Sequence, residues 1–162
     1  MRAHVGRLQR IVSCISQGHV VQARVGSAPA VYAVAFGRPG TVALSGSSGR
    51  YSTTVRQRLG PPIASALGRH RVDVLAYSYV LRDFEGPEIL AYHWHPEVGR
   101  STEPHLHISA GAGQLRSEFY RAHLPTGEVS VRQFVRLLIE AFGVRPLRTD
   151  WETLLAPPSG DD

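Results

Sequence analysis

Two short segments of this chain alternate histidine with large apolar residues. They are Tyr92-His93-Trp94-His95 and His105-Leu106-His107-Ile108. Because side chains of a β-strand point alternately to the two faces of a sheet, each segment sends its histidines to one face and its apolar residues to the other. If the two strands pair across the loop at 96–104, the apolar set is buried and four imidazoles gather on the opposite face. The pattern therefore predicts an antiparallel sheet with a histidine cluster on one face.

The rest of the chain places helices at both ends of a set of strands. Helical spacing predicts a helix over 5–17, and a Ser130-x-x-Gln133 capping box opens a strongly amphipathic helix that runs through Phe142. Short β-branched or alternating stretches predict strands at 20–25, 30–36, 41–44, 72–82, 89–95, 105–109 and 118–123. We therefore expect an α+β fold, with an antiparallel sheet of about five to seven strands and the helices packed on one side.

Turn-forming residues divide the first half of the chain. Gly-Arg-Pro-Gly at 37–40 is typical of a turn and is expected to join its two flanking strands as a hairpin. Residues 45–52, almost wholly serine and glycine, predict a mobile loop. A short helix is expected over 61–68, with two prolines near its start and a glycine at its end.

At the other end, a second capping box, Thr149-x-x-Glu152, is expected to open a short helix that carries Trp151. We expect the tail at 156–162 to be disordered. The length suits one domain over residues 1–155, since neither half alone would bury a sufficient core.

Composition indicates a globular protein rather than a disordered or membrane-spanning one. Apolar residues make up 43% and charged residues 19%, and the apolar runs are too short for a membrane span. The single cysteine, Cys14, excludes an intramolecular disulfide and makes the cytoplasm the default location. All 18 basic residues are arginine, and the net charge is +5. A GC-rich genome is the simpler explanation of the absence of lysine, whereas the functional interpretation is that guanidinium groups bind phosphate bidentately, as an RNA partner would require.

The four histidines suit general acid–base cleavage of RNA without a metal. Histidine titrates near neutrality, so one imidazole can take the proton of a 2′-hydroxyl while another protonates the leaving oxygen. We expect His105 and His107 in these roles, assisted by His93 and His95, with Arg100 nearest the phosphate. Further candidates for substrate contacts are Arg82, Arg121, Tyr92, Tyr120 and His123. Tyr77 and Tyr79 are candidates for stacking on bases and equally for the core.

The same histidines also suit a metal site. Neutral imidazoles at alternate positions of adjacent strands can surround one divalent transition metal such as zinc, with a carboxylate such as that of Glu97 or Glu103 completing the set. Solvated histidines on an open sheet face, in a non-catalytic domain that binds a partner protein, are a third interpretation. The residue pattern leaves all three hypotheses open.

One family shows a similar arrangement of short motifs. The motifs are Tyr77-Ser78-Tyr79-Val80-Leu81, Ile89-Leu90-Ala91-Tyr92 and Pro104-His105-Leu106-His107-Ile108, followed by a strand and a helix. Over roughly residues 72–142 they resemble TumE-type toxins of bacterial toxin–antitoxin pairs, and more widely the barnase–EndoU–colicin–RelE-type RNases. The resemblance implies a metal-independent endoribonuclease with an antitoxin-like protein partner. This sequence has His93-Trp94-His95 after Tyr92, where the family has an Asp-Asn pair, and Arg100 in place of a lysine.

Overall fold

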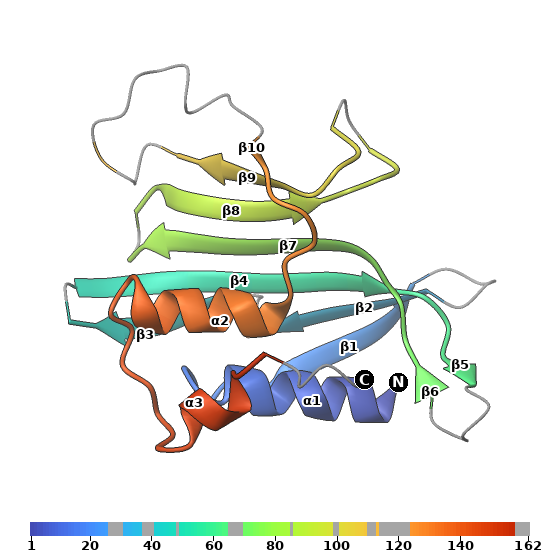
Figure 1. Cartoon of the computed structure of the whole chain (residues 1–162), viewed down its shortest axis with the longest axis horizontal. Helices are drawn as coiled ribbons and strands as arrows, with labels where there is room; N and C mark the ends of the chain where they lie inside the picture. Colours follow the sequence, from blue (N-terminus) through green and yellow to red (C-terminus); the bar gives the residue numbers. More distant parts are fainter. Residues whose placement is uncertain are drawn as a thin grey trace.

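The computed structural model describes residues 1–25, 31–36, 41–47, 49–64, 70–84, 86–98, 101–109, 113 and 124–157. The helices are α1 (Arg2–Val12), α2 (Val131–Glu140) and α3 (Trp151–Leu154), as Figure 1 shows. The strands are β1 (Val20–Val25), β2 (Val31–Phe36), β3 (Val42–Gly46), β4 (Gly49–Leu59), β5 (Ile63–Ala64), β6 (His70–Arg71), β7 (Val74–Asp83), β8 (Glu88–Trp94), β9 (His105–Ile108) and β10 (Leu124–Pro125). The expected α+β fold, with a helix near each end of the chain, is confirmed.

One antiparallel sheet dominates the described part of the chain. Its eight strands follow the order β1-β2-β4-β7-β8-β9-β10, with β3 beside β4. Strands β5 and β6 form a separate pair. Strands β7, β8, β9 and β10 pair in chain order, whereas β2 pairs with β4 past β3, and β4 pairs with β7 past β5 and β6. None of the helices in the described residues is long and apolar enough to cross a membrane.

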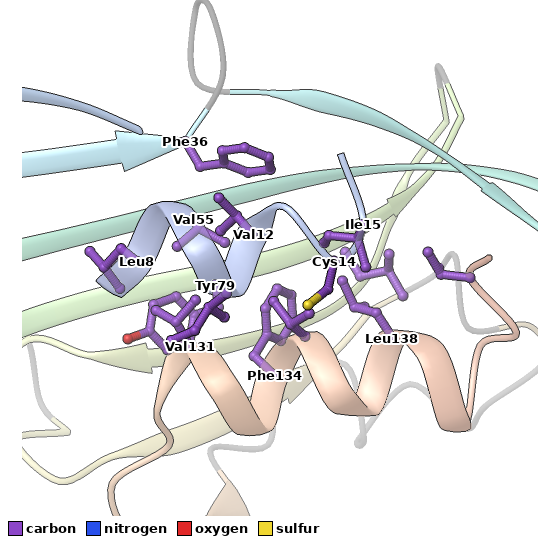
Figure 2. Close-up of a cluster of buried hydrophobic side chains, with 14 of the residues drawn as sticks. Leu8, Val12, Cys14, Ile15, Phe36, Val55, Tyr79, Val131, Phe134 and Leu138 are labelled. Atoms are coloured by element: carbon purple, nitrogen blue, oxygen red, sulfur yellow. The ribbon is translucent and has the colours of Figure 1, made fainter. Parts of the chain in front are cut away.

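The two long helices cover one face of this sheet. Helix α2 buries Val131, Phe134, Val135, Leu138 and Ile139, and the helical spacing of these residues makes one apolar stripe. Figure 2 shows this stripe meeting Leu8 and Val12 of α1 over sheet residues that include Phe36, Val55 and Tyr79. Every second residue of β4, β7 and β8 therefore lies on the side of the helices. The residues between them, including Arg56, Ser78 and His93, lie on the opposite face together with His105 and His107 of β9. The part of the chain that the structure describes places no helix on this opposite face, which is called the helix-free face below.

The longest strand of the sheet was not predicted. Strand β4 has 11 residues and pairs with β2, β3 and β7. The expectation of a mobile loop at 45–52 is wrong, since Ser45 and Gly46 end β3 while Gly49 to Ser52 begin β4. Serine and glycine are poor strand formers by themselves, but here the pairing partners on both sides of β4 decide the conformation.

The expected hairpin between strands 30–36 and 41–44 is also wrong. Strand β2 pairs with residues 55–59 of β4, and β3 pairs with residues 49–53 of the same strand. The two strands thus run one after the other along a single edge of β4 instead of pairing with each other. The intervening 37–40 lie outside the described residues.

Smaller elements differ from expectation for local reasons. Helix α1 ends at Val12 rather than residue 17, because the next amides, of Cys14 and Ile15, bond three residues back in tighter turns. The helix expected at 61–68 is contradicted at its start, where Ile63 and Ala64 form β5. The short C-terminal helix is confirmed as α3, but its first residues make no side-chain capping bond. The expected strand at 118–123 and residues 158–162 of the tail lie outside the described residues.

The expected capping box of α2 is confirmed, and its hydrogen bonds should stabilise the folded chain. The Ser130 hydroxyl accepts a hydrogen bond from the Gln133 amide, and the Gln133 side chain accepts one from the Ser130 amide. We expect Ser130→Ala to lower the free energy of unfolding by about 1 kcal/mol, measured by urea denaturation. Thr149→Ala is the matched control. It should change the free energy of unfolding little, because no side chain caps the start of α3. Equal losses in both variants would contradict this account.

Candidate metal centre

The predicted register between the two histidine strands is confirmed. In the pairing of β8 with β9, His93 lies opposite His105, and Tyr92 lies opposite Leu106. Tyr92, Trp94 and Leu106 pack against the hydrophobic core on the covered face. The alternation along both strands therefore sends the four histidines to the helix-free face, as expected from the sequence.

The four rings lie close together. The centroid of the His93 ring is 5.3 Å from that of His95, 6.0 Å from that of His105 and 5.2 Å from that of His107. The His105 and His107 centroids are 4.9 Å apart. Three of the four, His93, His105 and His107, place one ring nitrogen each within 4.8 Å of one another. These three residues are called the histidine triad below.

The spacing of the triad is close to what one metal ion requires. Nitrogen atoms bound to zinc at about 2.0–2.1 Å lie about 3.3 Å apart in a tetrahedral site. The three nitrogens, within 4.8 Å of one another, would reach that spacing by modest side-chain rotations. All three residues stand on paired strands, so the backbone that carries them is held by the sheet: His93 pairs with Ser78 and His105, and His107 pairs with Ala91.

A hydrogen bond on His105 selects the form of the ring that can bind a metal. His105 is buried, and its Nδ1 lies 2.7 Å from the backbone carbonyl oxygen of Glu103. A carbonyl oxygen only accepts, so Nδ1 carries the proton and donates, which leaves the lone pair on Nε2. The Ser101 hydroxyl lies 3.3 Å from the same Nδ1. A histidine that binds a metal through one ring nitrogen commonly donates a hydrogen bond from its other ring nitrogen to a carbonyl or carboxylate oxygen in this way.

His95 stands beside the triad rather than within it. Its ring contacts that of His93, but it is not among the residues whose nitrogens converge. Burial lowers the pKa of His95 below its ordinary value, and electrostatic repulsion between a protonated His95 ring and its neighbours His105 and Arg58 lowers it further. The neutral imidazole is therefore favoured at this position, which limits repulsion within the cluster.

Glu97, the expected carboxylate ligand, has another partner. Its Oε2 atom lies 2.6 Å from Nη2 of Arg58 on β4, and its side chain is 66% exposed. It is not part of the group of converging ligand atoms. The ligands that the described residues bring together are thus all nitrogen atoms, with no carboxylate among them.

The other predicted contact residues are divided between the two faces. Arg82 lies on the helix-free face, where its Nη2 atom is 3.4 Å from Glu88. Tyr92 lies on the covered face, and its ring meets Phe134 edge to face at 6.3 Å. Tyr77 and Tyr79 are 3% and 0% exposed and stack on each other within the core, so a role in stacking on bases is wrong for them. Arg100, Tyr120, Arg121 and His123 lie outside the described residues.

Two arginines near the histidines were missed by the sequence analysis. Arg56 and Arg58 both point to the helix-free face, on which the strand pairing aligns Arg56 with Ser78 and His93. They were missed because β4 was not predicted. The signal that would have identified them is the alternation of Val55, Gln57 and Leu59, which are buried, with these two arginines.

Comparisons with known proteins identify no relative of this chain. No protein-family model, curated protein or solved structure matches this chain. The resemblance to TumE-type toxins, and the RNase activity and antitoxin-like partner that it implies, therefore stay predictions.

Proposed function

We propose that this protein binds one divalent transition metal ion through His93, His105 and His107. The observation that carries the proposal is the convergence of three ring nitrogens to within 4.8 Å of one another. Imidazole nitrogen is a preferred ligand of zinc, copper, nickel and ferrous iron, whereas magnesium and calcium prefer oxygen. A set made only of nitrogen ligands therefore favours a zinc-type ion.

Three protein ligands leave at least one coordination position for water or a substrate, which is the pattern of catalytic rather than structural zinc sites. Three neutral imidazoles also leave the full double charge of the ion uncompensated, which strengthens it as a Lewis acid. When bound, such an ion lowers the pKa of its water and supplies a nucleophile near neutral pH. The chain's own contribution is to hold three nitrogens on paired strands and to fix His105 through the Glu103 carbonyl.

The direct test is metal stoichiometry. The full chain, produced without a histidine tag, is dialysed against buffer with zinc and then without it, and its metal content is measured by mass spectrometry. We expect about one zinc per chain, as one triad provides. A protein that keeps much less than one equivalent and shows no heat of binding in a zinc titration would contradict the proposal.

Metal-independent RNA cleavage is a second candidate, favoured by a separate observation. The helix-free face that carries the four imidazoles also carries arginines, including Arg56 and Arg58, which suit an RNA phosphate backbone. Cleavage of RNA that continues in EDTA and is lost in the double variant His105→Ala/His107→Ala would support this candidate. Cleavage abolished by EDTA and restored by zinc would instead support a metal-dependent activity, and growth arrest on expression would support a toxin role.

A further inference from the structure

A hollow of about 350 Å³ adjoins the histidine triad on the helix-free face. Its lining includes Arg56, Ser78, Arg82, Glu88 and His93, contributed by β4, β7 and β8. His93 belongs both to this hollow and to the triad. A molecule seated in the hollow would therefore contact the proposed metal site from one side.

The strand register brings an arginine to the far side of the same hollow. Arg56 lies opposite Ser78, and Ser78 lies opposite His93, so the three form one row across β4, β7 and β8. Neighbouring strands are about 4.8 Å apart, which separates the backbones of Arg56 and His93 by about 10 Å. The side chain between them is only that of serine. The row thus leaves room over Ser78 for a ligand group between a guanidinium and an imidazole.

The charges that line the hollow favour an anion. Arg82 is paired with Glu88, whose other carboxylate oxygen accepts a hydrogen bond from the Ser109 hydroxyl at 3.1 Å. Arg56 is exposed, and no carboxylate of the described residues lies within 4.0 Å of its guanidinium nitrogens. Glu88 is the acidic residue among the described residues of the lining, and it is already paired with Arg82 and Ser109, so the positive charge of Arg56 is left to act on a ligand.

We propose that this hollow binds the oxyanion group, phosphate or carboxylate, of a substrate whose reacting end is held at the triad. The guanidinium of Arg56 donates two hydrogen bonds to the oxyanion, as its planar fork suits both groups. The part of this inference that concerns the reacting end of the substrate rests on the proposed metal-binding function. The binding of the oxyanion group depends only on the residues that line the hollow. The protein would thus act on a substrate that carries a phosphate or carboxylate group, and Arg56 would be the residue that selects for this negative charge.

The test uses phenyl phosphate and benzoate as matched probes of the two oxyanions. Each is titrated calorimetrically into the full chain, with and without zinc, and into Arg56→Gln and Arg10→Gln. Both arginines are exposed, and Arg10 lies on α1, away from the hollow, so it controls for the loss of one charge. We expect at least one probe to bind, and Arg56→Gln to weaken it by about 10- to 100-fold while Arg10→Gln does not. The zinc affinity of Arg56→Gln should equal that of the unchanged chain.

Each outcome separates this inference from the metal proposal. Binding of either probe that depends on Arg56 supports the oxyanion site, and the probe that binds identifies phosphate or carboxylate as the group. Such binding in a chain that takes up no zinc would support the oxyanion site while the metal proposal fails. Normal zinc uptake with no binding of either probe, or with equal losses in Arg56→Gln and Arg10→Gln, would overturn the oxyanion site and leave the metal proposal standing.

Discussion

Replacement of His107 by glutamine is expected to lower the affinity for zinc by at least about 100-fold, because groups that merely orient a ligand already contribute about 10- to 100-fold. His107 supplies one of the three converging nitrogens, and its ring lies 4.9 Å from that of His105 and 5.2 Å from that of His93. Two imidazoles on their own make a weak chelate. The measurement is zinc titration in competition with a chromophoric chelator.

His95→Gln is the matched control for this prediction. His95 also lies on the helix-free face and its ring contacts His93, but its nitrogens are not part of the triad. We expect its zinc affinity to stay within a few-fold of the unchanged chain. Thermal unfolding provides a second readout, since zinc at about 100 times its dissociation constant should stabilise the folded chain by about 2.7 kcal/mol. That gain should persist in His95→Gln and vanish in His107→Gln. Equal behaviour of the two variants would contradict the assignment of the triad.

The position of the histidines could be predicted because the sequence contains its own check on register. A shift of one residue between β8 and β9 would expose Trp94 and Leu106 and bury the histidines, which is unfavourable on both counts. The alternation therefore leaves one acceptable pairing. The capping box and apolar stripe of α2 are equally local signals, and both were predicted correctly.

Which histidines converge could not be predicted in the same way. Alternation assigns all four to one face but does not distinguish His95 from the other three. The difference arises from register: His93 has His105 directly opposite, whereas His95 lies beyond the last pair of β8 with β9. The bond from His105 to the Glu103 carbonyl depends on the path of the loop before β9, and no residue pattern specifies that path.

The arginine side of the site lies on β4, a strand whose first residues local propensity does not favour, although Tyr51, Thr53 and Val55 within it are good strand formers. Strand β4 begins with Gly49 and Arg50, and its conformation is fixed by pairing with β3 and β7 on its two edges. Such non-local pairing overrides weak propensity. Because the sequence analysis did not predict β4, it could not place Arg56 on the same face of the sheet as His93.

The largest change in stability is expected for Phe134→Ala in α2. The Phe134 side chain is fully buried, stacks on Tyr79 with ring centroids 5.5 Å apart, and meets Tyr92 edge to face. It thus joins the helix to β7 and β8, the strands behind the histidine face. Truncation removes apolar contact and leaves a cavity, which should cost about 3–5 kcal/mol. Urea denaturation of the metal-free chain measures this loss.

Phe142→Ala is the control for this effect, since Phe142 is only half-buried and contacts Tyr51 at 6.2 Å near the end of the same helix. Phe142→Ala should lower the free energy of unfolding clearly less than Phe134→Ala does. Because Tyr92 is the neighbour of His93 in β8 and packs on Phe134, loosening this contact should also weaken zinc binding in a chain that is still folded. A Phe134→Ala chain with unchanged stability would show that α2 does not hold the sheet, and unchanged zinc affinity in a destabilised chain would show that the triad is supported by strand pairing alone.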